Sequence, residues 1–325
     1  MKDIRVPARL KLLWNKASLP AAVLVLLIPL VNLGAYPMRV AVMCSIYSLL
    51  ALSLNLLTGI AGQVSLGHAA FYAVGAYTSA LLALRLGLPL WITMPAAMLM
   101  GAAMGFVTFL PSRRVSGGYL AIVTLCRGFA APVWITAEIG ELKVNARSGH
   151  CYLQLVEKGG RNGVPQAQVF GVKLSSPYQY YLLSMTLTLL VLFLLINIQR
   201  SNAGRKLNAV RIDPIAAESM GIYPNRMKAL AFMVSGAIAA LAGALYAHFI
   251  GFIDPGSFRS DESVTALCMV VLGGMGSLPG SVLAAFLLTI IPEFLRGLDN
   301  VRMLIYGALL VAMMLFKTTG RKHDA

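Results

Sequence analysis

Few residues in this sequence are placed to carry out acid–base, nucleophilic or metal chemistry. His150 and Cys151 are adjacent, but no further ligand cluster lies near them, and the cysteines lack metal-ligand spacing, so we predict no metal site. The sequence contains no G-x-x-x-x-G-K-[ST] loop that could hold nucleotide phosphates. An intramembrane enzyme would need converging His, Asp, Glu or Cys side chains, and the pattern brings none together. The cysteines are Cys44, Cys126, Cys151 and Cys268.

Arg127 is the most unusual charged residue, because it lies near the middle of an apolar run at 118–137. A cation at the centre of a bilayer costs at least about 2.5–3.5 kcal/mol unless it faces protein or water. Arg127 could therefore meet the carboxylate of a passing substrate. The alternative is a structural arginine that pairs with backbone or extends to the membrane interface.

His68 begins another apolar run and lies four residues before Tyr72, so the two side chains could share a helix face and a hydrogen bond. A proton path through His68 would need a chain of carboxylates inside the membrane. The sequence offers none, since Glu138 and Glu293 lie at outer span ends. This shortage argues against an ion-coupled secondary transporter. We predict a translocation path that includes Gln63, Ser65, His68 and Arg127.

The composition shows in what surroundings these residues lie. Of the 325 residues, 58% are hydrophobic and 12% are charged, which is too apolar for a soluble chain, where about a quarter are charged. The net charge of +15 does not indicate nucleic acid, because the basic residues flank apolar runs. Runs near the roughly 20 residues of a spanning helix predict an all-α integral membrane protein with about ten transmembrane helices. We expect spans at 19–36, 39–58, 66–84, 89–110, 118–137, 178–198, 229–250, 263–277, 279–296 and 301–317.

The basic residues predict the orientation in the lipid bilayer. If the N-terminus is cytoplasmic, the dense Lys and Arg clusters at 113–114, 200–226 and 321–322 all fall on the inner side. Both termini are therefore predicted to be cytoplasmic. The first run could be a signal peptide, but it is long and lacks a clear cleavage site, so we interpret it as an uncleaved span. The predicted organisation is a basic N-terminus 1–18, a transmembrane domain 19–317 with an outer segment 138–177 and an inner loop 199–228, and a tail 318–325.

Clustered glycines interrupt two of the apolar regions. The chain reads GIAGQVSLGHAAF from Gly59 and GGMGSLPGSVLAAF from Gly273, which hints at an internal duplication. Broken backbone at membrane depth is tolerated only where protein or a water-filled cavity covers it, so these are candidate pore-lining or helix-crossing points. The alternative is close helix packing through small residues such as Gly75. The predicted helix-break glycines are Gly59, Gly62, Gly67, Gly273, Gly274, Gly276 and Gly280.

The inner loop contains a short helix with marked ends. Asp213 can cap the helix, Pro214 suits its first position, and Gly221 supplies the left-handed residue that ends it. A helix this short is marginal on its own, so we expect it to pack against a partner or the membrane domain. The alternative is an amphipathic interfacial helix that only joins two spans.

Two stretches resemble a known family. The stretch from Leu54, LNLLTGIAGQVSLGHAAFYAVGAYTSALL, resembles the signature region of the LivM group of ABC-transporter permeases, which move branched-chain amino acids inward. The loop from Gly204, GRKLNAVRIDPIAAESMG, resembles that family's cytoplasmic coupling segment and its Ala-Ala-x-x-x-Gly motif. AIVTL at 121–125 and LGGMGSLPGSVLAAFLL at 272–288 are similar as well.

The resemblance implies a permease of the type II importer kind in the bacterial inner membrane, a transport subunit and not an enzyme. Its implied partners are a homologous LivH-like permease, two cytoplasmic ATP-binding subunits and a periplasmic substrate-binding protein. ATP and Mg would be bound by the partner subunits, and no cofactor by this chain. The residues implied to couple to the ATPase are Arg205, Arg211, Asp213, Ala216, Ala217, Glu218 and Gly221.

The sequence departs from the family after AIVTL, where an aromatic residue, Gly and Glu usually follow. Here the chain reads Cys126, Arg127, Gly128 and Phe129, so an arginine is present and the acidic residue is missing. The cargo could then be a small organic acid instead of a hydrophobic amino acid, and urea or short amides also fit the motifs. The outer segment contains KGGRNG, which resembles the family's Gly-rich loop, and its charge suits contact with a binding protein.

Overall fold

A computed structural model describes the chain over 34–113, 124, 168–169, 172–173, 177–251, 253, 255–258 and 260–294. The predicted spans at 19–36, 118–137 and 301–317 lie outside these residues, apart from a few positions. Arg127, the pair His150 and Cys151, and both predicted cytoplasmic ends lie outside them as well.

Apart from the connecting segments, the described residues form helices and one short β-ribbon. In this ribbon β1 (Gln168–Val169) pairs antiparallel with β2 (Val172–Lys173). The helices are α2 (Ala35–Leu54), the π-helical turn η2 (Asn55–Ile60), α3 (His68–Arg85), α4 (Leu90–Ser112), α6 (Pro177–Arg200), α7 (Asn202–Ile212), α8 (Pro214–Ser219), α9 (Pro224–Ile250), the 3-10 turn η3 (Pro255–Phe258), α10 (Ser260–Gly273) and α11 (Leu278–Phe294).

Four helical stretches are long and apolar enough to cross a membrane: Tyr36–Ile60, Leu90–Ser112, Pro177–Arg200 and Pro224–Ile250. They coincide with four of the predicted spans. The helices α3, α10 and α11 lie on three further predicted runs, although α10 and α11 are shorter than a full span. The all-helical, membrane-embedded character is therefore confirmed, whereas the total of ten spans and the position of the termini stay predictions.

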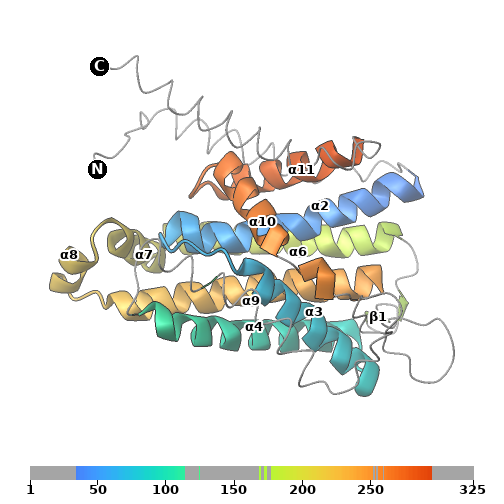
Figure 1. The fold of residues 1–325 in the computed structure, drawn as a ribbon, viewed down its shortest axis with the longest axis horizontal. Helices are drawn as coiled ribbons and strands as arrows, with labels where there is room; N and C mark the ends of the chain where they lie inside the picture. The colour runs from blue at the N-terminus through green and yellow to red at the C-terminus, as the bar shows by residue number, and fades with distance from the viewer. Residues whose placement is uncertain are drawn as a thin grey trace, which may run out of the picture.

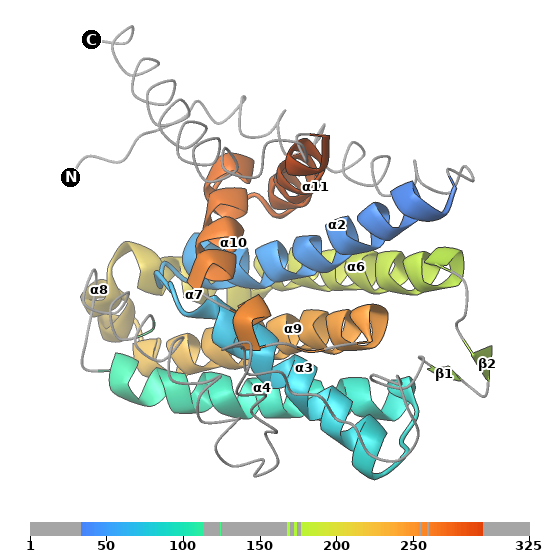
Figure 2. The same ribbon diagram turned by 45° about the vertical axis from the view of Figure 1, so that its right-hand side comes forward.

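The helices α2 and α9 form the centre of the bundle. In their apolar stretches 83% and 72% of the residues are buried, against 33% in α4 and 39% in α6. In both ribbon views α9 lies between α4 on one side and the pair α2 and α6 on the other, while α10 and α11 cover α2 (Figures 1 and 2). The segments α7 and α8 lie at one end of the bundle, to the left in Figure 1, and the β-ribbon lies at the other.

Glycines let α3 and α4 approach α9 closely. A Cβ added to Gly101 of α4 would collide with the carbonyl of Gly236 of α9, and one added to Gly236 would collide with the carbonyl of Gly101. On the other side, a Cβ on Gly75 of α3 would collide with the backbone of Ala240. Small residues that bring backbones together are the usual means of helix association in a membrane. The predicted packing role of Gly75 is thus seen in the structure.

Hydrogen bonds between buried polar side chains add to this packing. Ser45 Oγ and Ser184 Oγ are 2.7 Å apart between α2 and α6, and Tyr180 Oη donates to the Leu245 carbonyl at 2.6 Å between α6 and α9. Such bonds contribute about 0.6 to 2 kcal/mol each in a membrane interior. They fix the register of helices that glycine packing alone would leave free to slide.

Candidate functional site

The predicted short helix is present with the predicted ends. α8 begins at Pro214, and Asp213 Oδ1 accepts hydrogen bonds from the backbone N–H groups of Ile215 at 2.8 Å and Ala216 at 3.1 Å. Gly221 has φ of 77°, the left-handed conformation that ends the helix. All of these signals act between neighbouring residues, which explains why the sequence alone predicts them.

α8 lies at one end of the bundle (Figures 1 and 2), and apolar side chains within it and next to it are exposed. Ile215 is 80% exposed, Met220 82% and Ile212 74%. In contrast, Ala217 is buried against the rest of the chain. Exposed apolar groups gathered on one short segment are typical of a protein contact surface. The chain therefore presents a small apolar knob, formed by Ile212, Ile215 and Met220, beside a basic helix.

α7 holds α8 against the end of the bundle. Its inward face consists of Gly204, Leu207 and Val210, which are buried. A Cβ on Gly204 would collide with the Gln199 carbonyl, so glycine is needed for the close turn from α6 into α7. At the last turn of α7, Arg211 Nη1 donates a hydrogen bond to the Gly59 carbonyl. Arg211, which we expected to flank an ATPase contact, thus points back to the membrane domain.

The first glycine break begins where α2 runs into the π-helical turn η2. A Cβ on Gly59 would collide with the side chain of Asn55 and with the backbone nitrogen of Gly276, so the two predicted breaks lie against each other. Gly62 has φ of 71°, and a Cβ there would come within 2.7 Å of Arg211 Cγ. The chain then runs without helix to His68, where α3 begins.

The second break is the turn between α10 and α11. Gly274 and Gly276 both have φ of 90°, and a Cβ on Gly273 would collide with the backbone of Gly280. Asn55, which is fully buried, holds this turn from η2. Its Oδ1 accepts from Gly276 N at 2.8 Å, and its Nδ2 donates to the Ser277 carbonyl at 2.9 Å and to Ser281 Oγ at 2.7 Å.

Gln199, near the end of α6, provides a further contact, because its Nε2 donates to the Gly276 carbonyl at 3.1 Å. We use the term glycine junction for Asn55, Gly59, Gln199, Arg211 and Gly276. The sequence analysis missed Asn55 and Gln199. For Asn55 a signal existed, since an amide inside an apolar run must find hydrogen-bond partners when it is buried.

Three of the four predicted translocation residues, Gln63, Ser65 and His68, lie on the first break and at the start of α3, whereas Arg127 lies outside the described residues. Ser65 and His68 are fully buried, and Gln63 is half-buried. The predicted bond between His68 and Tyr72 is wrong: His68 Nε2 lies 2.7 Å from Ser53 Oγ of α2 instead. Ser65 Oγ, His68 Nδ1 and Tyr72 Oη are buried and have no hydrogen-bond partner in the structure described above.

The start of α3 is tied to the start of α10. The backbone N–H of Ala69 donates to Ser263 Oγ at 2.8 Å, which satisfies one of the donors that a helix start leaves open. The N-terminal ends of these two helices therefore meet inside the bundle beside His68. The transport role of Gln63, Ser65, His68 and Arg127 stays a prediction.

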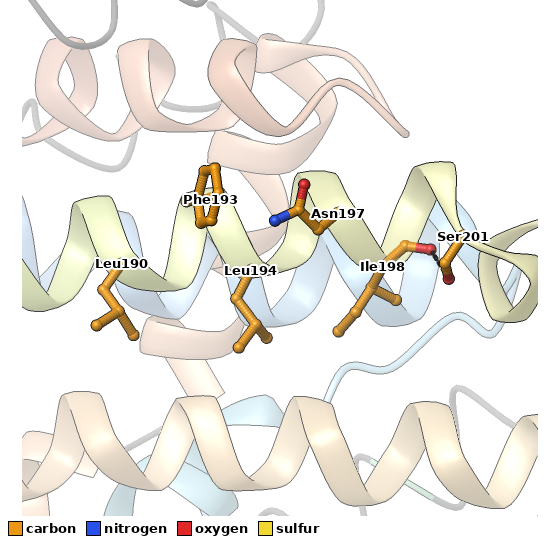
Figure 3. A pocket seen from close by; sticks show the side chains of 6 residues that line it. All are labelled: Leu190, Phe193, Leu194, Asn197, Ile198 and Ser201. Carbon is orange, nitrogen blue, oxygen red and sulfur yellow. Dashed lines mark hydrogen bonds between the residues drawn. The ribbon is translucent and has the colours of Figure 1, made fainter.

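A hollow of about 500 Å³ lies along the outer side of α6 (Figure 3). Its apolar wall includes Phe193, which is 67% exposed, and Leu190, which is 57% exposed. A single amide, Asn197, interrupts this wall. An apolar face of this kind suits lipid or a neighbouring helix better than a polar cargo. The lining residues are Leu190, Phe193, Leu194, Asn197, Ile198 and Ser201.

Apolar helices of spanning length packed through glycine, with two glycine breaks and a short capped helix at one end, are the architecture of a polytopic membrane protein. The chain belongs to the family of permease components of branched-chain amino acid transport systems, whose model matches residues 36–314. The resemblance to LivM-type permeases drawn from the sequence is thereby confirmed.

Individual relatives agree with this membership. The chain is 37% identical over 293 residues to the LivM permease proteins of high-affinity branched-chain amino acid transport in Salmonella typhimurium and Escherichia coli, covering 86% of this chain and 68% of each relative. It is 25% identical over 231 residues to LivH of Escherichia coli, covering 65% of this chain and 69% of LivH. An inward-facing structure of a metal-chelate type ABC transporter shares the fold, with a TM-score of 0.50, 18% identity and coverage of 94% and 96%.

Proposed function

We propose that the chain is a transmembrane subunit of an ATP-driven importer for branched-chain or other hydrophobic amino acids in the bacterial inner membrane. The LivM relatives, named as permeases of high-affinity branched-chain amino acid transport, support this cargo. We further propose that both termini face the cytoplasm. The C-terminal end of α4, which Arg113 caps, and the basic helix α7 lie at the same end of the bundle (Figures 1 and 2), as the positive-inside rule would require of one cytoplasmic face.

The observation that carries the proposal is the exposed apolar knob of α8 beside the glycine junction. Ile215 lies in the first turn of the capped helix α8 and Met220 at its C-cap, and a groove in an ATP-binding subunit could bury both. Burial of two such side chains is worth about 1.5–3 kcal/mol each. Arg205, Glu218 and the other charges around the knob would then form the rim of this contact, and the ATPase would supply the energy.

The complete importer would contain a LivH-like permease, two ATP-binding subunits that hold ATP and Mg, and a periplasmic substrate-binding protein. Transport would follow alternating access, in which closure of the ATPases on α8 changes the tilt of the spans. The segment 138–177 would face the binding protein. In this scheme no residue of this chain is catalytic.

The test is substrate-stimulated ATPase activity of the complete complex in lipid vesicles, with branched-chain amino acids compared with small organic acids and urea. We expect leucine, isoleucine or valine on the binding protein to stimulate hydrolysis. The same panel is run on Arg127→Ala. Stimulation that survives would make Arg127 structural, whereas selective loss for anionic cargo would place it in the path and change the substrate class. Failure to assemble with any ATPase would refute the proposal.

A further inference from the structure

We infer that Arg211 and Asn55 form a mechanical link that joins α8 to both glycine breaks, so that the breaks move together with α8. This inference rests on the proposed function, because it names how movement of α8 would reach the membrane spans. It assigns positioning roles to two side chains that need not touch cargo or nucleotide.

The first step of the link is Arg211. It lies on the last turn of α7, immediately before the Asp213 cap of α8, so its backbone must follow any displacement of that cap. Its guanidinium donates to the Gly59 carbonyl in η2. A charged donor makes a stronger hydrogen bond than a neutral one, which suits a contact that has to transmit force.

Gly62 makes this step possible. Its left-handed conformation turns the chain after η2, and its missing Cβ leaves room for the Arg211 side chain, whose Cγ would otherwise lie 2.7 Å from it. The Arg211 stem therefore lies across the first break as well as bonding to it. A displacement of α7 along the bundle would press on Gly62 and pull on Gly59 at the same time.

The second step is Asn55, which lies one helical turn before Gly59 in the same π-helical turn. Its amide makes three hydrogen bonds to the turn between α10 and α11, with Gly276, Ser277 and Ser281. Both its donor and its acceptor are used, and the residue is fully buried. Movement of η2 therefore carries this turn along, because separation would leave several buried polar groups without partners.

Gly59 and Gly276 connect the two glycine breaks through contact between their backbones. A Cβ on Gly59 would collide with the Gly276 nitrogen, so the two backbones are in direct contact. The Gln199 bond to the Gly276 carbonyl adds the end of α6, which leads directly into α7. The junction thus connects Gln199, before α7, to the second break and Arg211, in the last turn of α7, to the first break. A connected network of this kind can transmit a change between two arrangements.

The first test compares cargo-stimulated ATPase activity of the complete complex for wild type, Arg211→Ala, Arg211→Lys and Lys206→Ala. Lys206 is the matched control, since it is an exposed cation on the same helix. We expect cargo-stimulated hydrolysis to fall about tenfold or more in Arg211→Ala. Arg211→Lys should retain most of the cargo-stimulated activity, because a single charged donor is enough to bond the Gly59 carbonyl.

The second test measures movement. Spin labels are placed at Ser219→Cys in α8 and Met275→Cys in the turn, both of which are exposed, in a chain whose native cysteines are replaced. We expect one narrow distance distribution that is the same with and without trapped nucleotide. In Arg211→Ala or Asn55→Asp the distribution should broaden or shift with nucleotide. These labels keep the inference testable even if one variant loses ATPase coupling through poor assembly.

The outcomes separate this inference from the proposed function. A wild-type complex without cargo stimulation would refute the proposed function. If the wild type responds to cargo but Arg211→Ala behaves like Lys206→Ala, the importer stands and the link is refuted. A distance between the labels at positions 219 and 275 that changes with nucleotide in the otherwise wild-type chain would also refute the link.

Discussion

Replacement of Gly101 by leucine tests the packing on which the fold rests. Gly101 of α4 lies against Gly236 and Ala240 of α9, and even a single Cβ there would collide with the Gly236 carbonyl and the Ala240 methyl group. Backbone atoms cannot rotate out of the way as a side chain can. The leucine must therefore push α4 away from α9 along their shared contact.

The expected change in the free energy of unfolding is the balance of two opposing effects. Overpacking a tight contact costs about 1–3 kcal/mol, and a full leucine against backbone belongs at the upper end. The helix gains back about 1 kcal/mol because leucine is a better helix former than glycine. The net loss is about 2 kcal/mol, which on the scale of soluble domains lowers the melting temperature by about 4–8 °C.

The assay follows the thiols of Cys44 and Cys268, which are buried, with a dye that becomes fluorescent on reaction during heating in detergent. Cys126 and Cys151 are replaced in all variants so that the signal reports the helix bundle. Ala103→Leu is the matched control, since Ala103 lies on the exposed side of the same helix. The Ala103→Leu protein should have a melting temperature within about 2 °C of wild type. A Gly101→Leu protein with the same melting temperature as this control would refute the packing described for α4 and α9.

Three further substitutions test local features. Asp213→Ala removes the cap of α8, a loss of about 1 kcal/mol, and should lower cargo-stimulated ATPase activity, while Asp213→Asn should keep most of it. Gly221→Ala forces a left-handed alanine at a cost of roughly 1–2 kcal/mol and should speed hydrogen exchange in α8. Gly221→Asn should speed it less, because asparagine tolerates the left-handed conformation and nothing lies within 4 Å of the added Cβ. Tyr180→Phe loses the bond to the Leu245 carbonyl and should cost about 0.5–1.5 kcal/mol, read as a melting shift of a few degrees; equal melting of the two proteins would contradict the bond.

Local signals made α8 predictable from the sequence. Asp213, Pro214 and Gly221 act on their immediate neighbours, so their order in the chain is sufficient to place both ends of the helix. The glycine clusters likewise predicted interruptions where η2 ends and where α10 turns into α11. Hydrophobic run length placed the four long apolar stretches, because bilayer thickness fixes the length of a span.

Contacts between distant segments were not predictable in this way. Asn55 meets Ser277 and Ser281 more than 200 residues further along the chain, and spacing alone cannot show that these segments meet. The expected pair of His68 and Tyr72 failed for the same reason. A partner from another helix, Ser53, lies within hydrogen-bond distance of His68, and tertiary contact decided against the local pair.

The most direct test of the account is uptake of radiolabelled leucine into vesicles that contain the complete complex, with binding protein on the side opposite the ATP-binding subunits. We predict that this uptake requires hydrolysable ATP and persists when ion gradients are collapsed. We also predict that it falls about tenfold in Arg211→Ala but not in Lys206→Ala. Uptake driven by an ion gradient without ATP would contradict the account.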